Sequence, residues 1–307
     1  MSTQEYDDYW FHYVLEENPE EIKERVEELY ITIDEKKIHL DVYPNKTAGE
    51  KTLIFIHGTA VYSRFYAEFC YKLNQLGYRI IAPDLIGHGK SEGIRGHFTM
   101  EDLTKVISGV VSYTINSYGE DVVIVGSSLG GITALYSIAY DERIKGAICH
   151  NAAIFNEDAH ERIVKVRGIL RILKPLVPSM AKIFPKLKLS VWNYLDMEKL
   201  AQSMELKKRI EILLEDPMLS DKYTLTSLRA QMKEPLKKPV EKIAQPIMII
   251  NGDNDVLFSV DYVTEIYQRL SSTEKKLVIL DDTSHLIFQE NIDLALDHII
   301  PWLKNLF

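Results

Sequence analysis

Two hydrophobic patterns alternate along this chain. Short apolar runs rich in Val and Ile are typical of strands buried on both faces of a sheet, whereas longer stretches with apolar residues at every third or fourth position are typical of amphipathic helices. We predict eight strands, at 29–34, 37–43, 52–57, 79–83, 122–127, 145–150, 247–251 and 276–281. We predict helices near 63–76, 100–117, 129–140, 260–270 and 287–305. This alternation favours an α/β fold with a mostly parallel sheet, helices on both faces, and catalytic loops at the carboxyl ends of the strands.

Two segments depart from this alternation. Residues 1–28 are acidic and aromatic, and Asn18-Pro19-Glu20-Glu21 has the N-cap, first-turn proline and acidic residues of a helix start. Residues 153–240 have a mostly helical pattern, which is interrupted by Pro175, Pro178, Pro185 and Pro217. We therefore expect a core formed by 1–152 and 241–307, with 1–28 as a helical extension and 153–240 as a helical insertion.

The composition is ordinary for a globular protein and narrows the range of partners. The 307 residues are 46% hydrophobic, which allows a large core, yet no stretch approaches the roughly 18 apolar residues of a membrane-spanning helix. The net charge of −9 argues against a general role in nucleic-acid binding, which favours a basic surface. The N-terminus lacks a basic segment followed by an apolar one, so we expect a cytoplasmic protein.

The two cysteines do not suggest a disulfide or a metal site. Cys70 lies in a helical pattern and Cys149 in an apolar strand-like run, so we expect both to be buried free thiols. No group of Cys and His residues has the spacing of a zinc site. We therefore expect no metal site, and the reaction inferred below needs no cofactor.

The segment Gly126-Ser127-Ser128-Leu129-Gly130 gives the strongest indication of function. It joins an apolar strand to a helical pattern, so a serine stands at a sharp turn between the two. Such a turn forces its central residue toward positive φ and brings two backbones together, which explains the glycines on either side. The Ser128 hydroxyl would project from the end of the sheet beside the first amides of a helix, where it can act as a nucleophile.

Three other interpretations of this segment are less specific. The spacing of Gly126 and Gly131 matches a phosphate-binding P-loop, but Ile132 stands in the position of its lysine. A dinucleotide-binding fingerprint would need glycine at position 128, where serine stands. The third interpretation is an ordinary glycine-rich turn between a strand and a helix.

A second segment would supply part of an oxyanion hole. An apolar strand ends in His57-Gly58-Thr59 and leads through a loop into a helical pattern. In serine hydrolases of this layout, one backbone N–H comes from this loop and the other from the residue after the nucleophile. We expect Thr59 and Leu129 to be these donors, with Ala60 replacing Thr59 if the loop is shifted by one residue. His57 is expected to shape the loop by hydrogen bonding and not to transfer protons.

An acid and a histidine follow two strands near the other end of the chain. One predicted strand leads into Gly252-Asp253-Asn254-Asp255, and the next leads into a loop that ends at His285. The chain order is therefore serine, acid, histidine. This is the order of the α/β-hydrolases, and it differs from the orders in the chymotrypsin and subtilisin groups.

These motifs together resemble those of the α/β-hydrolase superfamily. The resemblance runs from residue 29 to residue 307, outside the insertion. Within the superfamily, the segment Pro83-Asp84-Leu85-Ile86-Gly87-His88-Gly89-Lys90-Ser91-Glu92-Gly93-Ile94-Arg95-Gly96 resembles the monoacylglycerol lipase and lysophospholipase branch. Its Gly-His-Gly-x-Ser turn is shared with haloperoxidase-like and esterase-like relatives, but the following Glu-Gly-x-Arg-Gly is more typical of the lipase-like branch.

The resemblance implies a role for each candidate site residue. Ser128 would be the nucleophile, His285 the general base and later the acid for the leaving group, and Asp255 would orient His285 and stabilise its imidazolium. Asp253 is the competing acid, but the acid of the family stands three residues after the glycine that ends the strand, which favours Asp255. Many relatives carry histidine where this chain has Ser127, so we expect altered local hydrogen bonding with the same mechanism.

The resemblance also implies that the insertion at 153–240 is a cap that shapes the acyl or alcohol pocket. Its apolar run at 169–177 could line a lipid-accepting groove or bury its apolar face on the core. Basic residues without any acidic residue between 162 and 188 could contact anionic lipid headgroups or form a solvated face. These are Arg162, Lys165, Arg167, Arg171, Lys174, Lys182, Lys186 and Lys188. His150 and Asn151, near the expected pocket, could contact substrate or anchor the cap.

The sequence therefore predicts a serine hydrolase that cleaves carboxylic esters through an acyl-enzyme. The expected substrates are monoacylglycerols, lysophospholipids or other single-chain acyl esters. A thioesterase or a C–C bond hydrolase on the same fold is the alternative, because these enzymes share the triad and differ in the pocket. A non-catalytic binding protein of the same fold is disfavoured because all three members of the triad are present.

Overall fold

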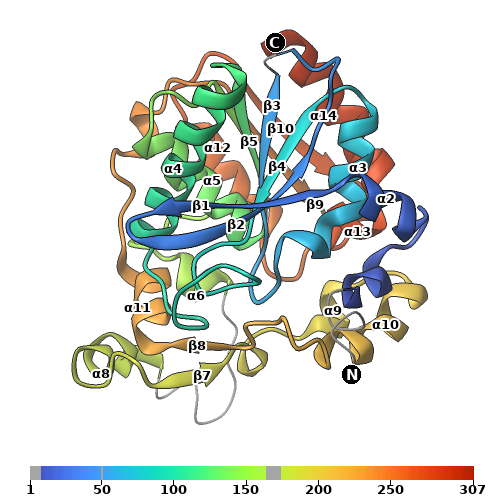
Figure 1. The fold of residues 1–307 in the computed structure, drawn as a ribbon. Coiled ribbons are helices and arrows are strands. Elements are labelled where there is room, and N and C mark those ends of the chain that lie inside the picture. The colour runs from blue at the N-terminus through green and yellow to red at the C-terminus, as the bar shows by residue number, and fades with distance from the viewer. Residues whose placement is uncertain (1–7, 50, 164–173) are drawn as a thin grey trace.

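The computed structural model describes residues 8–49, 51–163 and 174–307, and a twisted sheet of eight strands runs through its centre (Figure 1). The strands are β1 (Glu27–Ile33), β2 (Lys36–Tyr43), β3 (Thr52–Ile56), β4 (Arg79–Pro83), β5 (Val122–Ser127), β6 (Gly146–His150), β9 (Ile247–Gly252) and β10 (Lys275–Leu280). Their order across the sheet is β1-β2-β4-β3-β5-β6-β9-β10. All eight predicted strands are confirmed, with ends shifted by at most two residues.

Parallel pairing brings the strands that carry the predicted site to one edge of the sheet. β2 pairs antiparallel with β1 and β4, whereas every neighbouring pair from β4 to β10 in the sheet order is parallel. Ile56 of β3 lies opposite Gly126 of β5, and Ser127 of β5 lies opposite His150 of β6. The loops that follow these strands therefore begin side by side at the carboxyl edge, where parallel sheets bind their ligands.

Helices cover both faces of this sheet, as predicted (Figure 1). One face packs against α4 (Met100–Tyr118), α5 (Leu129–Tyr140) and α12 (Val260–Arg269). The other packs against α3 (Ala67–Gln75), α13 (Ile287–Glu290) and α14 (Ile292–Leu306). Successive residues of β3 point to opposite faces, so Ile54 joins the first core and Phe55 the second.

Two predicted helices are divided in the structure. The helix expected at 63–76 begins with the 3-10 turn η2 (Ser63–Tyr66) before α3. The helix expected at 287–305 is interrupted at Asn291, whose φ of −134° and ψ of 41° lie outside the helical region. Apolar periodicity continues across both breaks, which is why the sequence pattern does not reveal them.

The start of α4 shows how local sequence sets an element boundary. The Thr99 side chain accepts a hydrogen bond from the Asp102 amide, and the Asp102 side chain accepts one from the Thr99 amide. This reciprocal capping box satisfies two backbone donors that a helix start leaves free, and such a cap is worth about 1 kcal/mol. The helix therefore begins at Met100, as predicted.

The segment between β6 and β9, residues 151–246, contains the insertion expected at 153–240 and is called the insertion below. In Figure 1 its labelled helices and strands lie along the lower end of the sheet. Its described helices are α6 (Ala159–Ile163), α8 (Val177–Ile183), α9 (Met197–Leu200), α10 (Met204–Leu214) and α11 (Leu225–Lys233), with 3-10 turns η3 (Lys174–Leu176), η4 (Val191–Asn193) and η5 (Val240–Lys242). It also contains an antiparallel pair, β7 (Lys188–Ser190) and β8 (Lys222–Thr224). Strands of three residues are too short to produce a period-2 pattern, so this pair was not predicted.

The N-terminal extension joins the insertion to the core. It contains the 3-10 helix η1 (Tyr9–Tyr13) and α2 (Pro19–Arg25), which begins at the predicted Asn18 cap. The Tyr13 hydroxyl donates to the Asp216 carboxylate of the insertion at 2.5 Å. The buried Glu68 of α3 accepts from the amides of residues 15, 16 and 17. The extension therefore ties two parts of the fold together.

Cys70 and Cys149 are both buried and free, as predicted. Among the described residues, no helix is both long enough and apolar enough to cross a membrane. Of the predicted lipid-facing segments, residues 169–173 of the apolar run and Lys165, Arg167 and Arg171 of the basic run lie outside the described residues.

Candidate active site

Ser128 stands at a strained turn between β5 and α5. Its φ of 56° and ψ of −117° are unusual for a residue with a side chain, and its amide donates to the His150 carbonyl oxygen at 3.0 Å. A Cβ on Gly126 would lie 2.0 Å from the Gly130 oxygen, and one on Gly130 would lie 2.0 Å from the Ile56 oxygen. Glycine is therefore required at both positions, and the strand, sharp turn and helix expected from the sequence are present.

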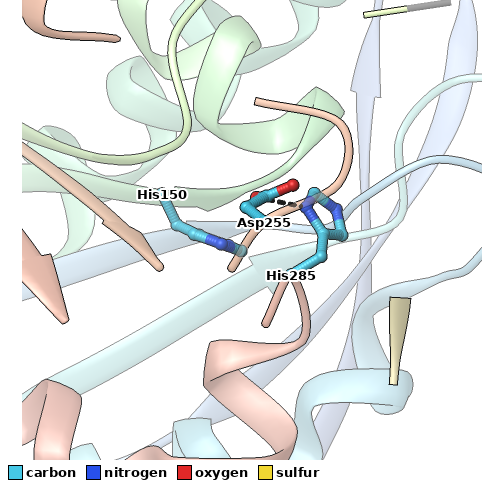
Figure 2. Close-up of side chains that lie close together, drawn as sticks. All are labelled: His150, Asp255 and His285. Atoms are coloured by element: carbon cyan, nitrogen blue, oxygen red, sulfur yellow. Dashed lines mark hydrogen bonds and ion pairs between the residues drawn. The ribbon is translucent and has the colours of Figure 1, made fainter. Parts of the chain in front are cut away.

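The predicted acid and histidine lie beside each other in the buried part of the site. His285 Nδ1 is 2.8 Å from Asp255 Oδ2, as Figure 2 shows. The other oxygen, Oδ1, accepts from the amides of Leu257 and Phe258 at 2.8 and 3.0 Å. Burial alone would raise the pKa of Asp255, but the charge and hydrogen bond of His285 outweigh it and lower that pKa to about 2. Asp255 is therefore ionised at neutral pH.

The competing acid, Asp253, is placed differently. Its side chain is exposed, and its Oδ1 accepts from the Thr283 amide at 3.1 Å. This contact holds the loop after β10 against the loop after β9. Asp253 therefore has a role in the turn that carries the histidine, whereas Asp255 contacts the histidine itself.

Phe258 lines the same pocket as Ser128, and its ring stacks on that of His285 with centroids 5.8 Å apart. No hydrogen bond between described residues joins the Ser128 hydroxyl to His285. Such contacts are often long in ligand-free enzymes and shorten when substrate binds. Ser128 is partly exposed, and it lines a pocket of about 50 Å³ together with Thr59 and Leu129. The hydroxyl is therefore accessible to a bound molecule.

The amides expected to form the oxyanion hole differ in their partners. The Ala60 amide donates to the Tyr223 hydroxyl at 2.9 Å, so it is already occupied. Within the described chain, no hydrogen bond uses the amide of Thr59. The amide of Leu129, the first residue of α5, has no acceptor within its helix. Both free amides belong to residues that line the Ser128 pocket, whereas Ala60 is fully buried.

His57 shapes the loop, as expected. Its Nδ1 donates to the Gly58 carbonyl oxygen at 2.9 Å, and its Nε2 accepts from the Leu85 amide at 3.0 Å. Burial lowers the pKa of His57, so the neutral ring is favoured. Because both ring nitrogens are occupied, His57 has no nitrogen left for proton transfer to substrate.

His150 and Asn151 are both fully buried and hydrogen-bond to residues of the site. Asn151 Nδ2 donates to Asp255 Oδ2 at 3.0 Å and to Asn251 Oδ1 at 2.6 Å. His150 Nδ1 lies 2.9 Å from Ser127 Oγ, next to the elbow. Sequence reasoning missed these contacts, although the pairing of β6 with β9 brings residue 151 close to the acid and could have indicated the Asn151 contact.

Among the described residues, two groups of side chains bring possible metal-ligand atoms close together. One ligand atom from each of His150, Asp255 and His285 lies within 4.8 Å of the others, and Glu28, His39 and Asp41 form a second such group. In the first group, the Asp255 carboxylate already accepts four hydrogen bonds. In the second, the carboxylates are already paired with the cations of Arg64 and Lys90. A metal would have to displace these partners in either group.

Several pockets that share lining residues lie in the insertion and where it meets the core. A pocket of about 170 Å³ inside the insertion shares His160, Tyr194 and Gln231 with the Ser128 pocket. Its other described walls are mainly apolar: Val177, Met180, Leu187, Leu189, Leu225, Leu228 and Met232. A third pocket, of about 680 Å³, shares Tyr194 with both and also carries Asp196, Glu198 and Lys199. The site therefore has one apolar arm and one more polar arm.

Comparisons with known proteins agree with this arrangement. A family model described as serine aminopeptidase, S33, matches residues 47–292. The monoacylglycerol lipase of Mycolicibacterium smegmatis is 23% identical over 290 residues, which cover 91% of this chain and 97% of that protein. The caffeoylshikimate esterase of Arabidopsis thaliana is 22% identical over 263 residues, which cover 78% of this chain and 73% of that protein.

A solved structure supports the fold independently. The crystal structure of the Paleococcus ferrophilus monoacylglycerol lipase has a TM-score of 0.73 and 24% identity, and the match covers 88% of this chain and 99% of that chain. The strand order, the elbow at Ser128 and the match to most of the chain therefore lead to one conclusion: this chain belongs to the serine aminopeptidase S33 family and is a serine hydrolase with the α/β-hydrolase fold.

Proposed function

We propose that this serine ester hydrolase cleaves single-chain acyl esters, of the monoacylglycerol or lysophospholipid type, through an acyl-enzyme on Ser128. The single observation that carries the proposal is the apolar pocket of about 170 Å³ that shares walls with the Ser128 pocket. An acyl chain in that pocket would lie next to the nucleophile. The names of the two lipase relatives support the same substrate class.

The reaction would proceed in two steps, acylation of Ser128 and hydrolysis of the acyl-enzyme. In the first, His285 takes the Ser128 hydroxyl proton while Oγ bonds to the carbonyl carbon, and the amides of Thr59 and Leu129 stabilise the negative oxygen. His285 then gives the proton to the departing alcohol, and the ester C–O bond breaks. In the second step, His285 takes a proton from water, the hydroxide attacks the acyl-enzyme, and Ser128 recovers its proton as the fatty acid leaves. Asp255 holds the His285 ring and stabilises its imidazolium throughout.

We propose that residues 153–240 act as a cap and that 1–152 and 241–307 form the hydrolase core. The apolar arm of the site is walled by this cap, which would bind the acyl chain. The more polar arm, with Asp196 and Lys199, would accommodate the alcohol or headgroup. In this division the core would carry out the reaction, and the cap would determine which substrate binds.

The proposed lipid substrate also suggests a contact with membranes. At the end of α8 the side chains of Ile183 and Phe184 are 71% and 57% exposed, and the lysines at 182 and 186 flank them. Exposed apolar side chains with basic neighbours are typical of surfaces that bind anionic lipid. This surface would bring the cap to the membrane in which the substrate lies.

An ester panel of graded chain length tests the proposed substrate class. Each CH₂ buried in the apolar pocket is worth about 0.8 kcal/mol, so kcat/KM should rise with chain length by up to about fourfold per CH₂ until the pocket is full. Leu228→Trp, which narrows that pocket, should move the optimum to shorter chains. Leu76→Trp, at an exposed site on the core, is the control and should leave the profile unchanged. A profile that is flat, or that falls from acetate onward, would contradict the proposal.

A further inference from the structure

Two residues of the insertion, Ser220 and Tyr223, hydrogen-bond to the loop that carries Thr59. The Ser220 amide donates to the Ala60 carbonyl oxygen at 2.8 Å. The Tyr223 hydroxyl accepts from the Ala60 amide at 2.9 Å. Both backbone hydrogen-bonding groups of Ala60 are therefore held by the insertion, and the core supplies neither partner.

The hydrogen bond between Ala60 and Tyr223 belongs to a chain of hydrogen bonds that runs through His88 to Ile86 in the core. The groups at the two ends of this chain fix which atom donates in each bond. The Ala60 amide can act only as a donor, and the Ile86 carbonyl oxygen only as an acceptor. His88 Nδ1 lies 3.1 Å from the Ile86 oxygen, and His88 Nε2 lies 2.9 Å from the Tyr223 hydroxyl. The Tyr223 hydroxyl must therefore accept from Ala60 and donate to a neutral His88. Burial, helped by the neighbouring His57, lowers the pKa of His88 to about 3, which keeps the ring neutral.

The Ala60 backbone needs this support. Its φ is +67°, a left-handed conformation that is strained for a residue with a side chain. Such a conformation persists only where the surroundings hold it. Because Ala60 follows Thr59 directly, relaxation at Ala60 would rotate the peptide between them, and the shifted Thr59 backbone would carry its own amide out of place beside the Ser128 pocket.

The core is shaped to receive the strand that carries Tyr223. The Thr224 amide donates to the Gly96 carbonyl oxygen at 3.0 Å, and the Ser220 hydroxyl donates to the Gly87 oxygen at 3.0 Å. A Cβ on Gly96 would lie 2.0 Å from the Lys222 carbonyl oxygen, so glycine is required for this approach. Gly87 and Gly96 belong to the segment 83–96, which resembles the lipase-like branch. This segment is therefore also the part of the core against which β8 packs.

We propose that Tyr223 is a positioning residue for the oxyanion hole, which makes transition-state stabilisation in the core depend on how the insertion is seated. The proposal rests on the proposed function, in which Thr59 donates to the oxyanion. Tyr223 does not touch substrate. It occupies the Ala60 amide and holds the left-handed turn next to Thr59, which lines the Ser128 pocket.

Tyr223→Phe tests this directly, because phenylalanine keeps the ring packing against Phe98 and removes the hydroxyl. One oxyanion donor is worth about 10²–10³ in kcat, so a displaced donor should lower kcat by roughly 10–100-fold. KM should stay within about twofold. Affinity for an acyl trifluoromethyl ketone, which forms an oxyanion on the serine, should fall in parallel with kcat/KM. A purely structural role would not weaken that inhibitor selectively.

A matched control exists in Tyr136. Its buried hydroxyl also joins an amide to an acceptor. It accepts a hydrogen bond from the Phe155 amide at 2.9 Å and donates one to the Glu234 backbone carbonyl oxygen at 2.8 Å. Tyr136→Phe should lower the melting temperature about as much as Tyr223→Phe, while kcat stays near wild type. Equal loss of kcat in both variants, or wild-type kcat in Tyr223→Phe, would overturn the proposal.

His88 provides a second route if Tyr223→Phe folds poorly. His88→Leu removes the acceptor of the Tyr223 hydroxyl and should reproduce the loss of kcat. His88→Gln, whose amide oxygen can still accept, should lose less. Equal activity of the two His88 variants would contradict the proposal that the hydrogen bond from Tyr223 to His88 holds the oxyanion loop. A wild-type protein that hydrolyses no ester would instead overturn the proposed function, and this inference would fall with it.

Discussion

The carboxyl edge of the sheet and the insertion beside it hold their residues in different ways. At the sheet edge, Ser128 is fixed by strand pairing and by glycines that leave no room for a Cβ, and Asp255 by four hydrogen bonds. The described part of the insertion consists of short helices and one pair of three-residue strands around apolar space. The first arrangement would hold the proposed reacting groups in one geometry for any substrate. The second could differ in its pocket walls without moving those groups.

This difference predicts which property of the enzyme a substitution in each region should change. Changes at the sheet edge should lower kcat for every ester alike, because they alter the transition state that all esters share. Changes in the insertion should reorder substrates or surfaces and leave the chemistry of a small ester intact. Tyr223 is the exception, since it belongs to the insertion but is joined to the loop of Thr59.

Apart from removal of Ser128 itself, the largest expected effect in this comparison is at the acid, Asp255. Asp255→Asn should lower kcat by about 10²–10⁴-fold on long and short esters alike, because asparagine would hold the wrong tautomer of His285 and would not stabilise its imidazolium. A loss of 10⁴ corresponds to roughly 5.5 kcal/mol. Asp253→Asn, which removes the same charge from an exposed neighbour, is the control and should stay near wild type. If the two variants exchange these outcomes, the acid has been assigned to the wrong residue.

The smallest expected effect is at the exposed end of α8. Replacing both Ile183 and Phe184 with serine should weaken binding to anionic vesicles by about tenfold or more, because two apolar side chains no longer enter the lipid. Turnover of a water-soluble short ester should stay within about twofold. Leu294→Ser, at another exposed apolar site, should change neither measurement. Unchanged vesicle binding in a co-sedimentation assay would remove the membrane contact from the account.

Much of the sheet edge could be predicted from the sequence because local patterns encode it. Strand runs and the glycines around Ser128 each reflect a requirement of the nearby backbone, whereas the choice of Asp255 over Asp253 came from the resemblance to the family. Parallel pairing then brings distant segments together by a general rule. The strands, the α/β class and the elbow geometry followed from these signals.

The insertion and the supporting contacts could not be predicted in the same way. The β7–β8 pair, the occupation of the Ala60 amide by Tyr223 and the contact of Asn151 with Asp255 join residues that are roughly 100 or more positions apart, or strands too short to show a period. No local pattern carries such information. Tyr223 in particular has nothing in its sequence neighbourhood that connects it to the loop after β3.

The most direct test of the central claim is to find which residue becomes covalently modified. The wild-type protein would be treated with a fluorophosphonate, and the adduct located by peptide mass spectrometry. We predict a single adduct on Ser128, its retention in Ser127→Ala, and its loss together with nearly all ester turnover in a folded Ser128→Ala variant. Modification at Ser127, or persistent labelling and turnover in Ser128→Ala, would contradict the assignment of Ser128 as the nucleophile.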